Sequence, residues 1–143
     1  MAWQKLMNKR AIEIAETADV SSLPNSVVLY SVSYLPTKEN KIKALEYLKA
    51  HKECITLDDT ECGKMLIALG AETNFKAPEA ELMKIWAIAS ERFIMSASGN
   101  VTAFVENADP RSTFRKIELP CLLKNERITS INGIDKFVFA ERF

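Results

Sequence analysis

The sequence predicts an α/β fold in which a helical N-terminal part packs against a small, mostly parallel four-stranded sheet. Residues 27–32 form a continuous apolar, β-rich run, which is typical of a strand buried on both faces of a parallel sheet. Residues 78–97 are the clearest helix of the chain. Further β-rich runs at 101–105, 128–131 and 137–139 are expected to join the first strand in one sheet, with helical material packed around it.

Two more helices are predicted before residue 52. Residues 3–17 alternate apolar residues with charges in a pattern that suits an amphipathic helix, and the polar, proline-containing stretch 21–25 ends it. A second helix is expected near 38–51, with lysines on one side. Its other side is expected to carry the apolar residues Ile42, Leu45 and Leu48.

A short acidic motif follows the extended segment 55–57. Asp58, Asp59 and Thr60 come directly before an apolar helical run that is expected to end at Gly70. An Asp or Thr in this position is an N-cap signal, because its side-chain oxygen accepts an otherwise unpaired backbone N–H. Adjacent residues usually point in different directions, so one Asp is expected to cap while the other faces a cleft.

The helix at 78–97 opens with Pro-Glu and stops at Ser98-Gly99. After the strand that follows, residues 107–111 read as a loop. A short segment then runs over 114–123 and is expected to be interrupted by Pro120. The apolar residues of the 78–97 helix recur at helical spacing: Leu82, Ile85, Trp86, Ala89 and Phe93.

Length and composition predict one globular domain of 143 residues. We expect its helical part to cover about 1–26 and 36–98, and its sheet part about 27–35 and 99–143. Hydrophobic residues make up 48% of the chain and charged residues 27%, which is a globular composition. Bases and acids balance at 19 each, which argues against a nucleic-acid partner, since such proteins normally carry a basic excess.

The sequence contains no membrane or secretion signal that we can identify. No segment approaches the ~18 consecutive apolar residues that a membrane helix requires. Charges interrupt the N-terminal region, where a secretory signal would have an apolar core. These charges belong to Lys5, Lys9, Arg10, Glu13 and Glu16. Export by the general route is therefore not indicated, whereas delivery as part of a larger polypeptide remains open.

Cysteine and histidine usage limits the catalytic options. Cys54, Cys62 and Cys121 lack CxxC spacing, and His51 is the only histidine, so a zinc site is disfavoured. Each Cys is expected to be a small buried apolar residue. A Cys54–Cys62 disulfide is the alternative, and sequence alone does not decide it. Acid chemistry is then the main catalytic option.

Two side chains stand out as candidates for such a site. Trp86 lies on the apolar face of its helix, where it is either a core residue or a platform for an aromatic ligand, with Ser90 one turn later. Glu118 stands between Ile117 and Leu119. An acid in an apolar stretch is costly to bury unless it is paired or used, although a surface acid on an amphipathic turn is the alternative. One use of such an acid is chemistry in which positive charge develops on a sugar. A carboxylate near C1′ of a ribosyl cation stabilises this cation or traps it covalently, as in glycosidases.

Four motifs in chain order resemble the ADP-ribosyl cyclase and NAD glycohydrolase family. In animal members a strand ending in Trp-Ser-Arg precedes a TLEDT segment, a helix with W-x-x-x-S-x-R-F, a strand and an S-T-F-x-x-x-E segment. The counterparts here are residues 29–32, 56–60, 86–93 and 112–118. The similarity covers about 27–131. No single motif is specific, but four in order at compatible spacings are much more so.

The resemblance implies a role for each candidate residue. Glu118 would be the catalytic acid that stabilises the oxocarbenium-like state, and Trp86 would stack on nicotinamide. Asp58 would occupy the position of the acid that holds the carboxamide. The resemblance implies NAD or NADP as the substrate, and neither a metal nor a cofactor. The remaining substrate-binding residues would be Tyr30, Ser31, Ser90, Thr113 and Phe114.

Three positions differ from the animal pattern. Tyr30 replaces a second Trp of the site and offers a smaller aromatic face. Val32 replaces an Arg that would contact phosphate, so phosphate binding must come from elsewhere, with Arg111, Arg115 or backbone N–H groups as candidates. Asp58 is one methylene shorter than the Glu of the animal pattern, a difference that bears on both the carboxamide contact and any cyclase activity.

The chain also lacks the half-dozen cysteine pairs that form disulfides in animal ectodomains. In this respect it resembles the bacterial toxin domains at the C-termini of contact-dependent growth inhibition proteins. The resemblance then implies an NAD(P) glycohydrolase toxin domain that depletes NAD in the target-cell cytoplasm. It would be secreted or delivered as part of a larger protein, and a cognate immunity protein would hold it inactive. Neither a nucleic acid nor a membrane is an expected partner. The alternatives are an ADP-ribosyltransferase or cyclase, and a non-catalytic nucleotide-binding module with a degenerate site.

Overall fold

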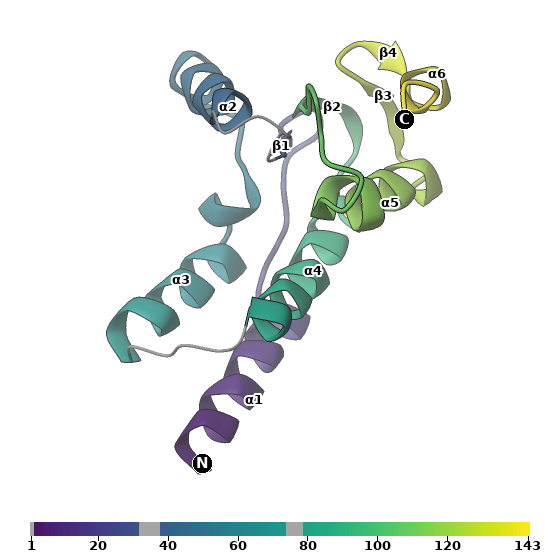
Figure 1. Ribbon diagram of the computed structural model, residues 1–143. Helices are drawn as coiled ribbons and strands as arrows, with labels where there is room; N and C mark the ends of the chain where they lie inside the picture. Colours follow the sequence, from purple (N-terminus) through teal and green to yellow (C-terminus); the bar gives the residue numbers. More distant parts are fainter. Residues whose placement is uncertain (1, 32–37, 74–78) are drawn as a thin grey trace.

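Three long helices form one end of the molecule in the computed structural model, which describes residues 2–31, 38–73 and 79–143 (Figure 1). Predictions that concern Val32, the stretch 36–37 and Pro78 lie outside these residues. The three helices are α1 (Ala2–Thr17), α3 (Glu61–Thr73) and α4 (Glu79–Met95), and α1 packs on both others. None of the described helices combines the length and the apolar character that a membrane crossing needs.

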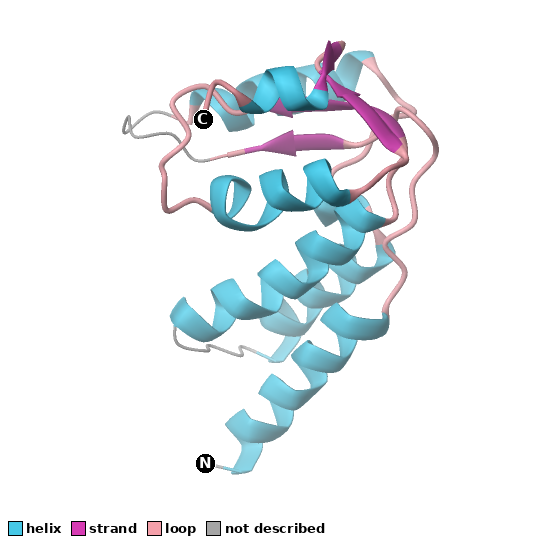
Figure 2. Cartoon of the chain, turned by 90° about the vertical axis from the view of Figure 1, so that its right-hand side faces the viewer, coloured by secondary structure: helices cyan, strands magenta, loops and turns pink. Residues whose placement is uncertain are grey.

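A four-stranded sheet lies beyond one end of these helices, as Figure 2 shows. The strands β1 (Val28–Tyr30), β2 (Gly99–Phe104), β3 (Ile128–Ile131) and β4 (Ile134–Asp135) lie in this order across the sheet. β1–β2 and β2–β3 pair in parallel, whereas β3–β4 is antiparallel. The predicted α/β fold with a mostly parallel four-stranded sheet is confirmed.

The last strand of the sheet is not the predicted one, because the segment expected as a strand forms helix α6 (Lys136–Ala140). The Asp135 carboxylate accepts hydrogen bonds from the backbone N–H groups of Phe137 (2.9 Å) and Val138 (3.3 Å) and so caps this helix. Phe139 is buried at 1% exposure, whereas Phe137 and Val138 are exposed. β-rich composition was therefore misleading here, since a local cap selects the helix.

The main hydrophobic core lies where the long helices meet the sheet. Phe93, Val101 and Leu122 are fully buried there, together with side chains from α1, β3 and α6. A smaller cluster lies between helix α2 (Glu39–Ala50) and the other face of the sheet. The sheet is thus covered by helices on both faces, as expected for parallel strands with continuous apolar sequence.

Helix α2 does not bury the apolar side that its sequence predicts. Ile42 and Leu45 are exposed, at 53% and 47%, whereas the polar Asn40 is 4% exposed. The Asn40 amide donates hydrogen bonds to the carbonyl oxygens of Ser31 (2.8 Å) and Glu106 (2.9 Å) at the ends of β1 and β2. These bonds fix the rotation of α2, so Asn40 and Ala44 are its buried residues and part of its apolar side faces outward.

Gly70 and Pro120 interrupt helical structure less than expected. α3 continues past Gly70 to Thr73, since a helix-interior glycine costs only about 1 kcal/mol relative to alanine. Pro120 lies in the first turn of helix α5 (Leu119–Lys124), where a missing backbone N–H is tolerated. The chain therefore runs from the π-helical turn η2 (Phe114–Glu118) directly into α5.

The cysteines are buried as predicted, and all three are free thiols. Cys54 is 8% exposed, Cys62 0% and Cys121 6%. The Cys62 thiol lies in the main core, with its Sγ 3.4 Å from a carbonyl oxygen of α1. Cys54 belongs instead to the small cluster beneath α2, so the two residues of the alternative disulfide lie in separate parts of the core.

Candidate active site

A cavity of about 660 Å³ opens beside the carboxyl end of β1, and all eight predicted site residues line it. Its volume falls in the range of small-molecule sites. The carboxyl end of a parallel strand is also where open α/β sheets place their ligands. The wall is built by β1, α4, the turn η1 (Leu57–Asp59), the loop before η2, and η2 itself. The eight residues are Tyr30, Ser31, Asp58, Trp86, Ser90, Thr113, Phe114 and Glu118.

Helix α4 contributes Trp86 and Ser90, which lie one turn apart on the face toward the cavity. Trp86 is only partly buried and also packs against the main core, so it is both a core residue and a wall of the cavity. Phe93 is 0% exposed in the core. The Arg92 guanidinium donates to two carbonyl oxygens at the end of α1, at 2.7 and 2.8 Å. The W-x-x-x-S-x-R-F motif is thus divided between the cavity and the scaffold.

The two neighbouring aspartates of η1 have different surroundings, as predicted. The Asp59 carboxylate accepts hydrogen bonds from the backbone N–H (3.0 Å) and hydroxyl (3.2 Å) of Thr56, so Asp59 holds the turn closed. Asp58 lines the cavity and remains exposed. The part of Asp58 that is shielded from solvent by the cavity wall still raises its pKa through desolvation. The adjacent Asp59 carboxylate raises this pKa further, and the Lys41 ammonium lowers it.

Gly63 allows the first turn of α3 to lie directly against η1. A Cβ on Gly63 would stand 2.1 Å from the Leu57 carbonyl oxygen and 2.7 Å from the Asp58 Cα. The Thr60 hydroxyl completes the junction by accepting the Gly63 N–H at 3.0 Å, which confirms the predicted N-cap. The backbone that carries Asp58 is therefore held by close packing. A glycine inside a helix was the available sequence signal for this contact.

The π-helical turn η2 places Glu118 on the cavity wall. Its first residue, Phe114, is 1% exposed and packs edge-on against Phe143, with ring centroids 5.6 Å apart. Ser112 and Thr113, just before η2, and Glu118 at its end all line the cavity. Single π-helical turns are rare and often occur at functional sites.

Burial in this wall raises the pKa of Glu118 from its ordinary value of 4.5 to about 7. The hydrogen bond with Ser90, which is 5% exposed, opposes the rise by favouring the ionised carboxylate. The side chain keeps partial access to the cavity. An acid of this kind, near half-ionisation at neutral pH and facing a cavity, is typical of functional carboxylates.

Tyr30, the last residue of β1, also lines the cavity. Burial raises its pKa, and the carboxylates of Asp58, Asp59 and Glu118 add to the rise. The phenol therefore keeps its proton at neutral pH and can donate a hydrogen bond. Ser31, the next residue, is 6% exposed, and its backbone N–H bonds the end of β2 at 3.1 Å.

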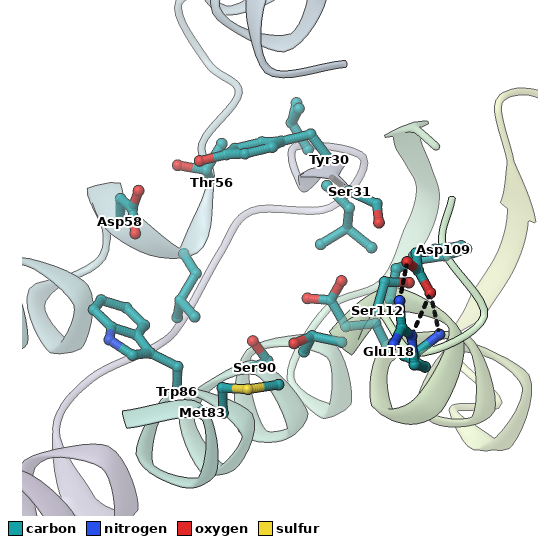
Figure 3. A pocket seen from close by; sticks show the side chains of 16 residues that line it. Tyr30, Ser31, Thr56, Asp58, Met83, Trp86, Ser90, Asp109, Ser112 and Glu118 are labelled. Carbon is teal, nitrogen blue, oxygen red and sulfur yellow. Dashed lines mark hydrogen bonds and ion pairs between the residues drawn. The ribbon is translucent and has the colours of Figure 1, made fainter. Parts of the chain in front are cut away.

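The labelled side chains follow one another across the cavity in Figure 3. Asp58 and Trp86 lie on one side, Ser90 lies between, and Glu118 lies across from Trp86. Asp109 lies on the far side of Glu118. The arrangement joins an aromatic face to a carboxylate of raised pKa, which suits a ligand with a flat cationic ring and an electron-poor centre beside it.

Sequence reasoning missed Met83 and Asp109, which also line the cavity. Met83 lies one turn before Trp86, so the helical spacing of α4 was a usable signal. Asp109 stands in the Asp-Pro-Arg sequence before η2, a turn-forming pattern that carries no functional signal by itself. Within the described residues, no three His, Cys, Asp or Glu side chains converge as metal ligands do.

Solved ADP-ribosyl cyclases have a similar fold. The Aplysia cyclase with substrate NGD and product cGDPR is 27% identical, with a TM-score of 0.55 over 76% of this chain and 48% of that one. An ADP ribosyl cyclase with N1-cIDPR is 22% identical, with a TM-score of 0.56 and coverage of 89% and 62%. Porcine CD38 with a covalent intermediate, ribo-F-ribose-5′-phosphate, is 18% identical, with a TM-score of 0.54 and coverage of 87% and 66%.

No protein-family model and no curated protein sequence matches the chain. The chain spans about half the length of the Aplysia cyclase, at 48%. Each of the four sequence motifs contributes residues to the wall of one cavity, in a fold that these solved structures share. The chain therefore has the ADP-ribosyl cyclase-like fold that its motifs predict.

Proposed function

We propose that this chain is an NAD(P) glycohydrolase, which cleaves the bond between nicotinamide and ribose and releases nicotinamide and ADP-ribose. The observation that supports this most strongly is the position of Glu118, a carboxyl group with a pKa of about 7, across one cavity from Trp86. The Aplysia cyclase, which has this fold, was solved with the dinucleotide NGD as its substrate. No cofactor enters the proposal, since NAD or NADP is itself the substrate.

The proposed reaction suits an acidic site without histidine. The C1′–N bond breaks, and nicotinamide leaves as a neutral molecule with the bonding electron pair. The ionised Glu118 stabilises the positive charge that develops on the ribose. A water molecule then forms the new C1′–O bond and releases one proton. Because the nicotinamide ring in NAD is already cationic, its departure requires no general acid.

The other side chains position the leaving group. Trp86 offers its face to the nicotinamide ring, and a cationic ring is attracted to an indole face. Asp58, which lies on the same side of the cavity, would accept hydrogen bonds from the carboxamide. Arrival of the cationic ring favours the ionised form of Glu118, because opposite charges stabilise each other in a buried site. Substrate binding thus converts Glu118 to its reactive form.

The test is incubation of the purified protein with NAD and separate measurement of nicotinamide, ADP-ribose and cyclic product. We expect nicotinamide and ADP-ribose in equal amounts and a large loss of turnover in Glu118→Gln. Unchanged NAD, or equal turnover by the variant, would contradict the proposal. A cyclic product would indicate a cyclase, and ADP-ribose attached to a macromolecule would indicate a transferase. Binding without turnover would indicate a non-catalytic module.

We further propose that the chain acts as a toxin domain, delivered as part of a larger protein into the target-cell cytoplasm and inhibited by an immunity protein. The support is the resemblance of its motifs together with its three free, buried cysteines, which suit a reducing compartment. Inducible expression in bacterial cells, with growth and NAD content followed together, tests this. We expect both to fall with the wild type and neither with Glu118→Gln; unchanged NAD would refute the toxin role.

A further inference from the structure

The cavity is strongly acidic, which is unfavourable for a ligand that carries a diphosphate. Asp58, Asp109 and Glu118 all line it. Among the described residues, Arg111 is the single Lys or Arg side chain that does so. A cation beside the diphosphate would offset this repulsion, and a guanidinium is well suited because its planar donors bind phosphate oxygens in pairs.

The structure separates the two arginines that the sequence leaves as candidates. The Arg115 guanidinium donates to the Phe143 carbonyl oxygen at 3.1 Å and lies over the Phe143 ring, 5.5 Å from its centroid. Arg115 thereby ties η2 to the end of the described chain and does not line the cavity. Arg111, four residues earlier, does.

Asp109 holds Arg111 in place through three hydrogen bonds. The Asp109 carboxylate accepts the backbone N–H of Arg111 at 2.8 Å, and its two oxygens accept Nε and Nη2 at 3.3 Å each. The Arg111 side chain is 84% exposed, against 26% for Asp109. Exposed ion pairs of this kind contribute little to stability, so the pairing with Asp109 orients the guanidinium without preventing it from also binding a more highly charged partner.

The order of groups across the cavity matches the order of groups in a dinucleotide. Trp86 and Asp58 lie at one side, Glu118 lies across from them, and Asp109, which holds Arg111, lies beyond Glu118. Nicotinamide against Trp86 would place its ribose at Glu118. The diphosphate, which follows the ribose, would then reach Arg111.

We propose that Arg111, positioned by Asp109, binds the diphosphate of the substrate and so determines affinity for NAD without taking part in the chemistry. The proposal rests on the proposed glycohydrolase function for the identity of the ligand. The role is one of binding, so Arg111 is expected to affect KM and leave kcat nearly unchanged.

The kinetic test compares Arg111→Gln and Arg111→Lys with Lys116→Gln, a control that removes an exposed positive charge near the same loop. We expect Arg111→Gln to raise the KM for NAD about tenfold or more, with kcat within about twofold, since charged hydrogen bonds are lost. Arg111→Lys should recover part of the loss. Nicotinamide riboside, which has no phosphate, should be cleaved equally by wild type and Arg111→Gln. An unchanged KM for NAD would overturn the proposal.

A binding measurement separates this proposal from the proposed reaction. ADP-ribose is titrated calorimetrically into the wild type, Arg111→Gln and Lys116→Gln at two salt concentrations. We expect about tenfold weaker binding for Arg111→Gln alone, and a smaller salt dependence in that variant. If the wild type binds ADP-ribose through Arg111 but leaves NAD intact, the glycohydrolase function fails and this inference stands. Equal binding by wild type and Arg111→Gln, or no binding by either, overturns it.

Discussion

Glu118→Gln tests whether the fold is destabilised by its own site carboxylate. Burial raises the pKa of Glu118 from 4.5 to about 7. Between these values the unfolded chain has lost the proton and the folded chain keeps it, so the folded state binds more protons and stability falls as pH rises. The stabilisation by the protonated form is complete below about pH 4.5 and lost above about pH 7. A Gln side chain has nearly the same shape as Glu but is always neutral. The Glu118→Gln variant therefore does not lose stability through ionisation at this position.

The pKa difference sets the size of the effect. The rise from 4.5 to about 7 corresponds to about 3 kcal/mol at full ionisation, at 1.36 kcal/mol per pH unit. Between pH 5 and pH 8 the wild type should lose about 2.5 kcal/mol relative to Glu118→Gln. For 143 residues this equals a relative change in Tm of about 8 °C. Partial access of the side chain to the cavity makes these the upper values.

The assay is urea denaturation of both proteins at pH 5, 6, 7 and 8, followed by circular dichroism. Glu91→Gln serves as the control, because Glu91 is an exposed acid on the same helix that supplies Ser90. We expect the gap in free energy of unfolding between Glu118→Gln and wild type to widen from pH 5 to pH 7 and to change little between pH 7 and pH 8. This widening should exceed any change in the gap between Glu91→Gln and wild type.

Parallel stability curves for Glu118→Gln and wild type would refute the reasoning. They would mean that the carboxyl group has the same pKa in the folded and unfolded chain. The reasoning would be refuted more strongly if the wild type became more stable relative to Glu118→Gln as the pH rises. The Ser90 hydrogen bond would then outweigh burial, and the pKa of Glu118 would lie below 4.5.

Three further predictions concern activity and packing. The kcat/KM for NAD should rise about tenfold from pH 6 to pH 8 as Glu118 ionises. Steady-state release of nicotinamide measures this rise. A kcat/KM that does not change with pH would contradict the role of Glu118. Trp86→Ala should lower kcat/KM about tenfold to a hundredfold through lost stacking, and Trp86→Phe less; equal rates would show that Trp86 is only a core residue. Gly63→Ala should destabilise the fold by about 1–3 kcal/mol, because its Cβ meets the Leu57 carbonyl at 2.1 Å. Gly70→Ala, with open space around the new Cβ, should stabilise it by about 1 kcal/mol, and urea denaturation distinguishes the two.

The elements that sequence predicted well are those with long, consistent patterns. The continuous apolar run before Ser31 is β1, and the helical spacing around Trp86 is α4. The spacing also explains how the W-x-x-x-S-x-R-F motif divides. Ser90 follows Trp86 by about one turn and shares its face, whereas Arg92 lies two residues further and points toward α1.

The features that sequence did not predict depend on contacts between distant segments. Asn40 turns α2 by bonding the ends of two strands, and nothing near Ile42 or Leu45 indicates this. The π-helical turn that carries Glu118 has no sequence pattern of its own. The close approach at Gly63 is different, because η1 and the first turn of α3 are neighbours in the chain and a glycine inside a helix was a usable signal. Local propensity therefore identifies the elements, and tertiary contacts decide their faces.

A site that must hold an unfavourable carboxylate needs rigid support, and Asn125 contributes to it by joining, away from the cavity, the two segments that carry Trp86 and Glu118. Its buried amide donates to the Ile94 (2.8 Å) and Ala97 (2.9 Å) carbonyl oxygens, at the end of the helix that carries Trp86. Asn125 itself directly follows α5, which continues from the turn that carries Glu118. The bonds join α4 to the segment that continues from η2, and they therefore favour one spacing between the aromatic face and the carboxylate. Fixed geometry of this kind is what electrostatic stabilisation of a ribosyl cation requires.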